Sequence, residues 1–204
     1  GATLTGAIFL GANVTGADFR GTVSRGFTDT KLSSTSSYIN KDLRGIALGS
    51  NNLSGWDLSH QNMFGANLSY AMLDNTNLSF SDLGKANFTN AGFVGSATSS
   101  LTTNLTMADL RGATGFVGGR PTRTILPDGT IKFFHLDSGD HMVLHDFPGL
   151  TSAGTTSLTP LPILVTGSLS VDNGSTLTMV VDNANYGSKI TFGAGASITL
   201  GGTL

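Results

Sequence analysis

One large apolar residue recurs at every fifth position between residues 41 and 95, without a slip. A period of five fits neither an α-helix, which repeats about every 3.6 residues, nor a β-strand, which alternates at every second residue. The run therefore needs an architecture whose own repeat is five residues, such as a square coil with one pentad on each side. The recurring residues, called pentad centres below, are Leu43, Leu48, Leu53, Leu58, Met63, Leu68, Leu73, Leu78, Leu83, Phe88 and Phe93.

The residues around each centre follow a fixed order: a small residue, Asn or Asp, the centre, and then two polar residues or glycine. Examples are ANLSY and SDLGK, with Ala66 and Ser81 at the small position. We expect the centre and the small residue to point into the coil and the other three to face water. The same pattern opens the chain, where four pentads make one complete coil. Their centres are Leu4, Phe9, Val14 and Phe19.

The five-residue period breaks at about residues 21–42. Phe27, Leu32, Tyr38 and Ile39 are apolar, but they do not fall on the period. We interpret this segment as a local insertion that packs against one side of the coil and contains a short helical turn.

The second half of the chain has a period of two. The five-residue period returns briefly at Leu105 and Leu110, and a segment rich in glycine follows, so we place a boundary between a repeat domain, 1–117, and a β-rich region, 118–204. A wider, less regular β-solenoid is the first interpretation of this region, and a small β-sandwich is the alternative. Strands are expected at 124–136 (two short strands around the turn Leu126–Gly129), 141–146, 161–166, 168–171, 176–181, 189–192 and 197–200.

The pentads resemble those of the pentapeptide-repeat family, whose fold is a right-handed, quadrilateral parallel β-helix. Residues 26–63 and 160–204 are also similar to segments of secreted pentapeptide-repeat proteins of planctomycete-type bacteria, which often end in a PEP-CTERM sorting signal. The sorting signal is absent from this sequence. The resemblance implies an all-β fold and a secreted or cell-surface location.

The composition agrees with a chain made of turns and strands. All 13 acidic residues are Asp, and Gly numbers 28, so strong helix formers are scarce. The net charge of −2 provides neither a basic footprint for nucleic acid nor the strongly negative rod that a DNA-mimicking topoisomerase modulator needs, and that function stays a remote alternative. There is no cysteine for a disulfide or a thiolate metal site, and no apolar run is long enough for a membrane span.

The only dense group of metal-ligating residue types is in HLDSGDHMVLHDF, where Asp140, His141 and His145 are weak candidates. On a strand the two imidazoles share a face but do not converge, and the spacing matches no zinc or calcium pattern. We interpret the group as solvated and expect no metal and no cofactor. The sequence has no G-x-S-x-G nucleophile elbow, so we expect a protein that is not an enzyme.

A stack of parallel coils exposes unpaired backbone groups at each end, and solenoids ordinarily cover them with capping repeats. The first coil and the last strand of this sequence show no polar cap. We therefore expect an extracellular structural protein that self-associates head to tail into a fibre. The alternatives are a portion of a longer protein whose caps lie outside the sequence, and a monomeric surface module that binds polysaccharide. The predicted assembly edges are Ala2, Leu4, Ile198, Leu200 and Leu204.

Overall fold

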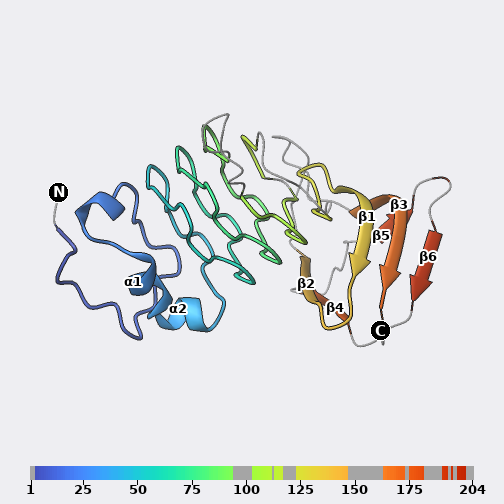
Figure 1. Ribbon diagram of the computed structural model, residues 1–204, viewed down its shortest axis with the longest axis horizontal. Helices are drawn as coiled ribbons and strands as arrows, with labels where there is room; N and C mark the ends of the chain where they lie inside the picture. Colours follow the sequence, from blue (N-terminus) through green and yellow to red (C-terminus); the bar gives the residue numbers. More distant parts are fainter. Residues whose placement is uncertain are drawn as a thin grey trace.

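The protein is an elongated stack of coils, with the N-terminus at one end and a group of parallel strands at the other (Figure 1). The computed structural model describes residues 3–93, 103–111, 113–116, 123–146, 163–172, 175–181, 190–192, 194 and 197–200. The predicted boundary at residues 117–118 lies outside these ranges.

Each regular turn of the repeat region takes four pentads. Asn62 pairs in parallel with Asp82, and Asn67 pairs in the same way with Asn87. Backbone hydrogen bonds join successive coils; for example, Leu43 N donates to Asn62 O (2.8 Å) and Asn62 N donates to Lys41 O (2.9 Å). Because each side is straight for only a few residues before the next corner, the described repeats form isolated bridges instead of longer strands.

From Gly11 onward, a residue with a positive φ forms each described corner of the regular pentads, two positions after the pentad centre. At Gly65, for instance, φ is +69°, and Ala66 N donates to Met63 O (2.9 Å) across the turn. A positive φ at the third position of a turn suits glycine or asparagine best. Several corners are nevertheless occupied by large residues, including His60, Tyr70 and Phe80.

The pentad centres fill the interior of the coils. From Leu43 to Phe93 every centre is 0–2% exposed, and small residues such as Ala66 and Ser81 are buried beside them. In the first coil Val14 and Phe19 are buried, whereas Leu4 and Phe9 are half-buried.

Residues 22–42 are part of the second coil. Asp18 pairs with Ala47 across this turn, a wider spacing along the chain than in a regular turn, such as the one that pairs Asn62 with Asp82. The side chains of Phe27 and Leu32 are buried in the core, and the Phe27 ring stacks on that of Phe19 (4.2 Å between centroids). The predicted insertion therefore completes a longer turn of the coil, and its apolar side chains enter the core.

Short helices carry the chain through this segment. They are η1 (Val23–Arg25), α1 (Asp29–Ser33) and α2 (Ser36–Ile39). Thr28 and Thr35 cap the two α-helices, because their side-chain oxygens accept from backbone N–H groups of the first turn. The Lys31 ammonium donates to the carbonyl oxygens of Leu4 (2.8 Å), Thr5 (2.7 Å) and Ala7, which ties α1 to the first coil.

The strands of the second half pair only in parallel among the described residues. β3 lies between β1 on one side and both β5 and β6 on the other, and β2 pairs with β4. Paired positions of β2 and β4, such as His141 and Thr176, are 35 positions apart, so these coils are wider than the repeat coils. Because β-sandwiches are commonly built from antiparallel sheets, this parallel pairing favours the solenoid over the small β-sandwich. The strands are β1 (Thr130–Leu136), β2 (His141–Asp146), β3 (Ile163–Val171), β4 (Thr176–Val181), β5 (Ile190–Phe192) and β6 (Ser197–Leu200).

Two of the expected strand boundaries differ from the structure. The segments 161–166 and 168–171 are joined in β3, because the chain continues through Gly167 with a shift in register against β1. The strand expected before the turn at Leu126–Gly129 is reduced to a single bridge between Ile125 and Asp109. Pro127 has no N–H to donate, so pairing stops where the chain turns.

Replacing Leu68 with Asp should lower the free energy of unfolding by at least about 3 kcal/mol, because the carboxylate would be unpaired inside a dry core. Asn67→Asp is the matched control, since its side chain points outward from the same pentad. Urea denaturation followed by circular dichroism measures both variants. Equal stability of the two would contradict the inward orientation of the pentad centres.

Candidate binding groove

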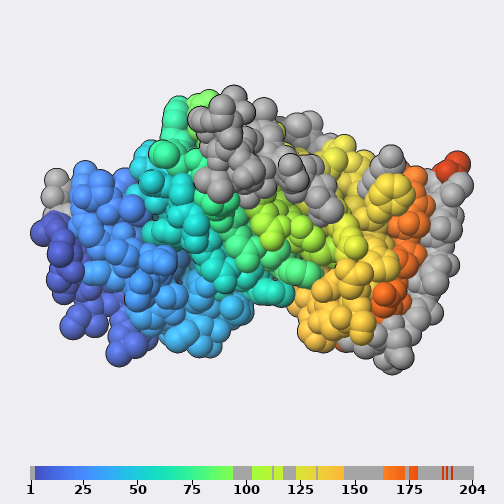
Figure 2. All heavy atoms as spheres, viewed as in Figure 1, coloured from blue at the N-terminus to red at the C-terminus, as the bar shows by residue number. Residues whose placement is uncertain are grey.

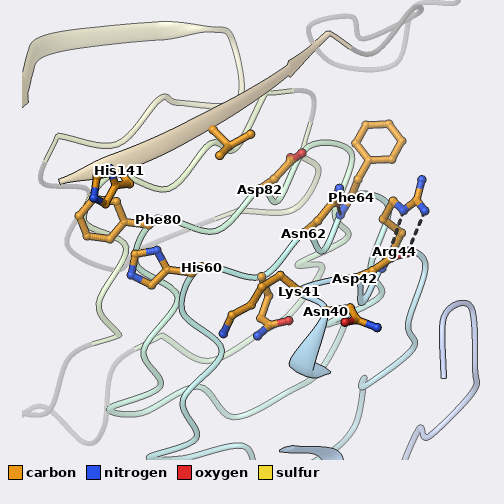
Figure 3. A pocket seen from close by; sticks show the side chains of 12 residues that line it. Asn40, Lys41, Asp42, Arg44, His60, Asn62, Phe64, Phe80, Asp82 and His141 are labelled. Atoms are coloured by element: carbon orange, nitrogen blue, oxygen red, sulfur yellow. Dashed lines mark hydrogen bonds and ion pairs between the residues drawn. The ribbon is translucent and has the colours of Figure 1, made fainter. Parts of the chain in front are cut away.

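The step from the narrow repeat coils to the wider strand coils leaves a hollow in the molecule. In Figure 2 it appears along one edge, between the cyan coils and the yellow strands. It is a cavity of about 810 Å³, lined by residues of the segments 40–44, 60–64 and 80–82 and by His141 and Val143 of β2. We call it the ledge groove (Figure 3).

Two aromatic rings stack at one end of the ledge groove. His60 and Phe80 occupy equivalent corners of successive coils, and their rings are parallel, with 4.8 Å between centroids. Both residues have a left-handed backbone, with φ of +55° and +57°. That conformation costs a residue other than glycine about 1–2 kcal/mol. Glycine serves at some neighbouring corners, such as Gly65, but Tyr70 has nearly the same φ outside the groove, so the conformation is common to the repeat corners. What distinguishes His60 and Phe80 is that their rings stack on each other at the groove.

Polar and aromatic groups alternate toward the other end of the groove. Arg44 forms an ion pair with Asp42 (2.8 Å), and the two lie beside Phe64 (Figure 3). Asn62 Oδ1 accepts from the backbone N–H of Phe64 (3.2 Å). Among the described residues the Asn62 amide nitrogen donates to no partner, so it can donate to a ligand.

The groove has no net formal charge at neutral pH. Its lining includes two cations, Lys41 and Arg44, and two carboxylates, Asp42 and Asp82. Burial lowers the pKa of the His60 imidazole below its ordinary value of 6.5, and the nearby Lys41 lowers it further, so this ring is neutral at pH 7. A strongly charged ligand would gain little from such a site.

Gln61, at a position that small residues occupy in most pentads, is 1% exposed and lines the groove. Its Nε2 donates to Tyr38 O (3.3 Å), but its Oε1 accepts no hydrogen bond from the described protein. A buried acceptor without a donor costs about 1–3 kcal/mol. Asn51 occupies the equivalent position of another pentad, and its side chain donates to Phe19 O and Leu48 O and accepts from Val23 N.

The sequence did not identify the ledge groove. The available signal was the only glutamine of the chain, at a small position, together with bulky residues at corners that favour glycine. Of the weak metal candidates, His141 reaches the groove, and its Nδ1 is 2.6 Å from Thr176 Oγ1. Asp140 instead accepts from the backbone N–H of Asp137 (3.0 Å). The side chain of His145 lies outside the described part of the structure.

The structure describes the predicted assembly edges only in part. Leu4 is half-buried on the first coil. Ile198 and Leu200 belong to β6, where they pair with Leu169 and Val171 of β3. Ala2 and Leu204 lie outside the described ranges.

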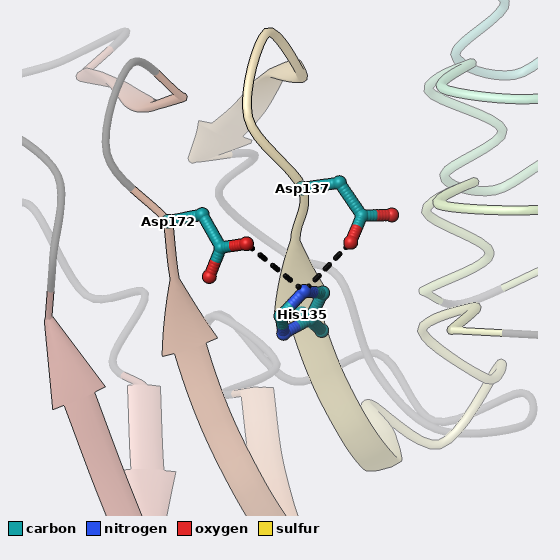
Figure 4. A group of neighbouring side chains, drawn as sticks. All are labelled: His135, Asp137 and Asp172. Carbon is teal, nitrogen blue, oxygen red and sulfur yellow. Dashed lines mark ion pairs between the residues drawn. The ribbon is translucent and has the colours of Figure 1, made fainter.

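A second cluster joins β1 to β3 (Figure 4). His135 Nε2 lies 2.7 Å from a carboxylate oxygen of Asp137 and 3.5 Å from one of Asp172, while its Nδ1 contacts the Ser170 hydroxyl. His135 and Asp137 belong to the motif HLDSGDHMVLHDF that was singled out from the sequence. Only the pairing of β1 with β3 brings Asp172 to them and places Ser170, 35 positions along the chain, opposite His135.

The ligand atoms of His135, Asp137 and Asp172 lie within 4.8 Å of one another, which is close enough to share a metal ion. Arg123, however, already forms an ion pair with Asp137 (2.5 Å) and neutralises one of the two carboxylates. We therefore interpret the cluster as a clamp of charged side chains that connects two coils.

Comparison with known families accounts for the repeats. Residues 1–22 and 42–79 match the sequence model of the family described as Pentapeptide repeats, in eight copies. The chain contains pentapeptide repeats. The second matched segment supplies most of the floor of the ledge groove, including His60 and Gln61. A comparison with curated proteins gave no match.

The longest helix among the described residues has five residues, far fewer than the roughly 20 that a membrane-spanning helix requires.

The clamp at Asp137 should make stability depend on pH. The Arg123 guanidinium holds the pKa of this carboxyl below its ordinary value of 3.8. The contribution of the ion pair to the free energy of unfolding is therefore present above pH 3.8, and it is lost as the pH falls through the folded-state pKa. The urea midpoint of the native chain should exceed that of Asp137→Asn at about pH 6, and the difference should shrink by about pH 2. A constant difference over this range would show that the ion pair does not stabilise the fold.

Proposed function

We propose that this protein is a non-enzymatic, extracellular surface module that binds polysaccharide in the ledge groove. Its scaffold is a right-handed, quadrilateral β-helix of pentapeptide repeats, continued by a wider β-solenoid. The secreted location follows from the resemblance to exported PEP-CTERM-type proteins, and a cysteine-free chain rich in Ser, Thr and Asn is compatible with export.

The stacked rings of His60 and Phe80, held in strained corners at the groove, carry this proposal. A sugar ring has an apolar face of C–H groups and an edge of hydroxyls. Aromatic side chains offer a flat apolar surface to the face, and neighbouring amides and charged groups bond to the edge. The groove combines the two in one place, with Phe64, Asn62 and Arg44 beyond the stacked pair.

The charge of the site favours a neutral polysaccharide. The cations and carboxylates of the lining are equal in number, and Asp42 is already paired with Arg44. An acidic chain or a nucleic acid would need an excess of positive charge, because its phosphates or carboxylates must be neutralised at the surface.

His60→Asn should abolish retention of the full chain on the insoluble neutral polysaccharide that retains the native protein, with cellulose, mannan and xylan as the probes. The free energy of unfolding of His60→Asn should differ from that of the native protein by less than about 1 kcal/mol. Asparagine tolerates the left-handed backbone of this corner, and that gain offsets the loss of ring stacking. Sedimentation of the protein with the polysaccharide measures retention.

Tyr70→Asn is the control for this experiment. Tyr70 occupies a corner with a φ of +58°, is 61% exposed and lies outside the groove, so the same exchange should leave retention unchanged. Native protein that none of the three polysaccharides retains would contradict the proposed function, and equal retention of His60→Asn would contradict the role of the groove.

We propose end-to-end self-association as a second function. The first described coil carries exposed apolar side chains, with Ile8 88% and Leu10 78% exposed, beside the half-buried Leu4 and Phe9. Burial of such side chains against another coil would be favourable. The backbone bonds that join coils along the axis could continue from one molecule to the next.

The double variant Ile8→Lys/Leu10→Lys should abolish concentration-dependent association of the full chain and any fibres that the native protein forms. Analytical ultracentrifugation and negative-stain electron microscopy measure the two effects. Exchange of the exposed Met72, which is remote from this coil, for Lys is the control. Native protein that stays monomeric at every concentration would contradict the second function.

A further inference from the structure

We infer that Gln61 determines the specificity of the ledge groove by accepting a hydrogen bond from a ligand hydroxyl. This inference rests on the proposed function, and it adds a chemical requirement: the ligand must donate a hydrogen bond to Gln61. A ring with the same shape but without O–H groups would not bind.

The hydrogen bonds of Gln61 support this role. Tyr38 O can only accept, so the amide nitrogen of Gln61 must face it and Oε1 must point elsewhere. No described donor reaches Oε1, although the side chain is 1% exposed and lines the groove. The amide of Asn51, at the equivalent position, has protein partners on both its oxygen and its nitrogen. Packing at this position therefore does not require an unpaired acceptor.

The surroundings of Gln61 indicate which donor would pair with it. The stacked rings of His60 and Phe80 come from the same wall of the groove, and His60 is the residue that precedes Gln61. A sugar that lies against these rings presents its hydroxyl edge to the floor of the groove. Oε1 is buried in this structure, so it accepts from the hydroxyl once the Gln61 side chain turns toward the ligand. A charged donor such as an ammonium group would meet no excess of negative charge in the groove, because Lys41 and Arg44 balance the carboxylates of the lining.

Isothermal titration calorimetry of the full chain tests the inference. The probe is a hexaose cut from the neutral polysaccharide that retains the native protein, compared with the same hexaose after methylation of every hydroxyl. The native chain should bind the first and not the second. Gln61→Met, which keeps the length of the side chain but removes the acceptor, should bind the unmodified hexaose about tenfold more weakly or worse.

Stability separates this role from a purely structural one. In Gln61→Met the unpaired acceptor is gone, and Tyr38 O still accepts from Lys41 N (3.1 Å), so the urea midpoint without sugar should be unchanged or higher. Asn51→Leu is the matched control: it removes three hydrogen bonds, so it should lower the midpoint and leave the affinity per folded molecule unchanged.

The outcomes distinguish the two proposals. If the native chain binds no neutral hexaose, the proposed function fails, and the inference fails with it. If the native chain binds while Gln61→Met binds equally well, or if the methylated hexaose binds as tightly as the unmodified one, the inference alone is overturned. A lowered urea midpoint of Gln61→Met with unchanged affinity would assign Gln61 to the fold.

Discussion

The backbone hydrogen bonds between coils are the interaction on which the rest of this structure depends. In the repeat region each pentad makes bonds such as that from Leu43 N to Asn62 O, and these bonds force equivalent residues of successive coils to lie one above another. The apolar centres then form a continuous dry core, while the positions between them form columns on the outer walls. A residue type that recurs at every fourth pentad therefore forms a column of like side chains on one wall of the stack.

The ledge groove is a consequence of changing the coil size. A stack of equal coils has flat walls and offers no ledge of this kind. Here coils of four pentads are followed by wider ones, in which paired strand residues such as His141 and Thr176 are 35 positions apart. β2 therefore extends beyond the segments 40–44, 60–64 and 80–82. The stacked side chains of these segments line the floor of the groove, and β2 of the wider coil forms one of its sides. Rigid scaffolds of this kind hold binding groups in place at little cost in conformational entropy.

One short motif shows how the surroundings change the meaning of a sequence. Asp-Leu-Arg occurs at residues 42–44 and again at residues 109–111, and in both places the Arg and Asp side chains form an ion pair. The first pair is exposed to solvent at the groove. The second is buried, with 0% of the Arg111 side chain and 4% of that of Asp109 exposed. An exposed ion pair contributes little to stability, and its side chains can contact a ligand. The charged groups of a buried ion pair must instead find all their hydrogen-bond partners within the protein.

The sequence by itself determined the repeat fold, because a period of five in residues such as Leu43 and Leu68 is compatible with a coil of pentads and with neither a helix nor a long strand. It also indicated most strands of the second half, including 141–146, 176–181 and 197–200. Only the tertiary structure decided that the second half pairs in parallel, that Phe27 and Leu32 complete the second coil, and that Gln61 lies beneath a groove. Those outcomes depend on contacts between residues 20 to 35 positions apart, whose register no local pattern encodes.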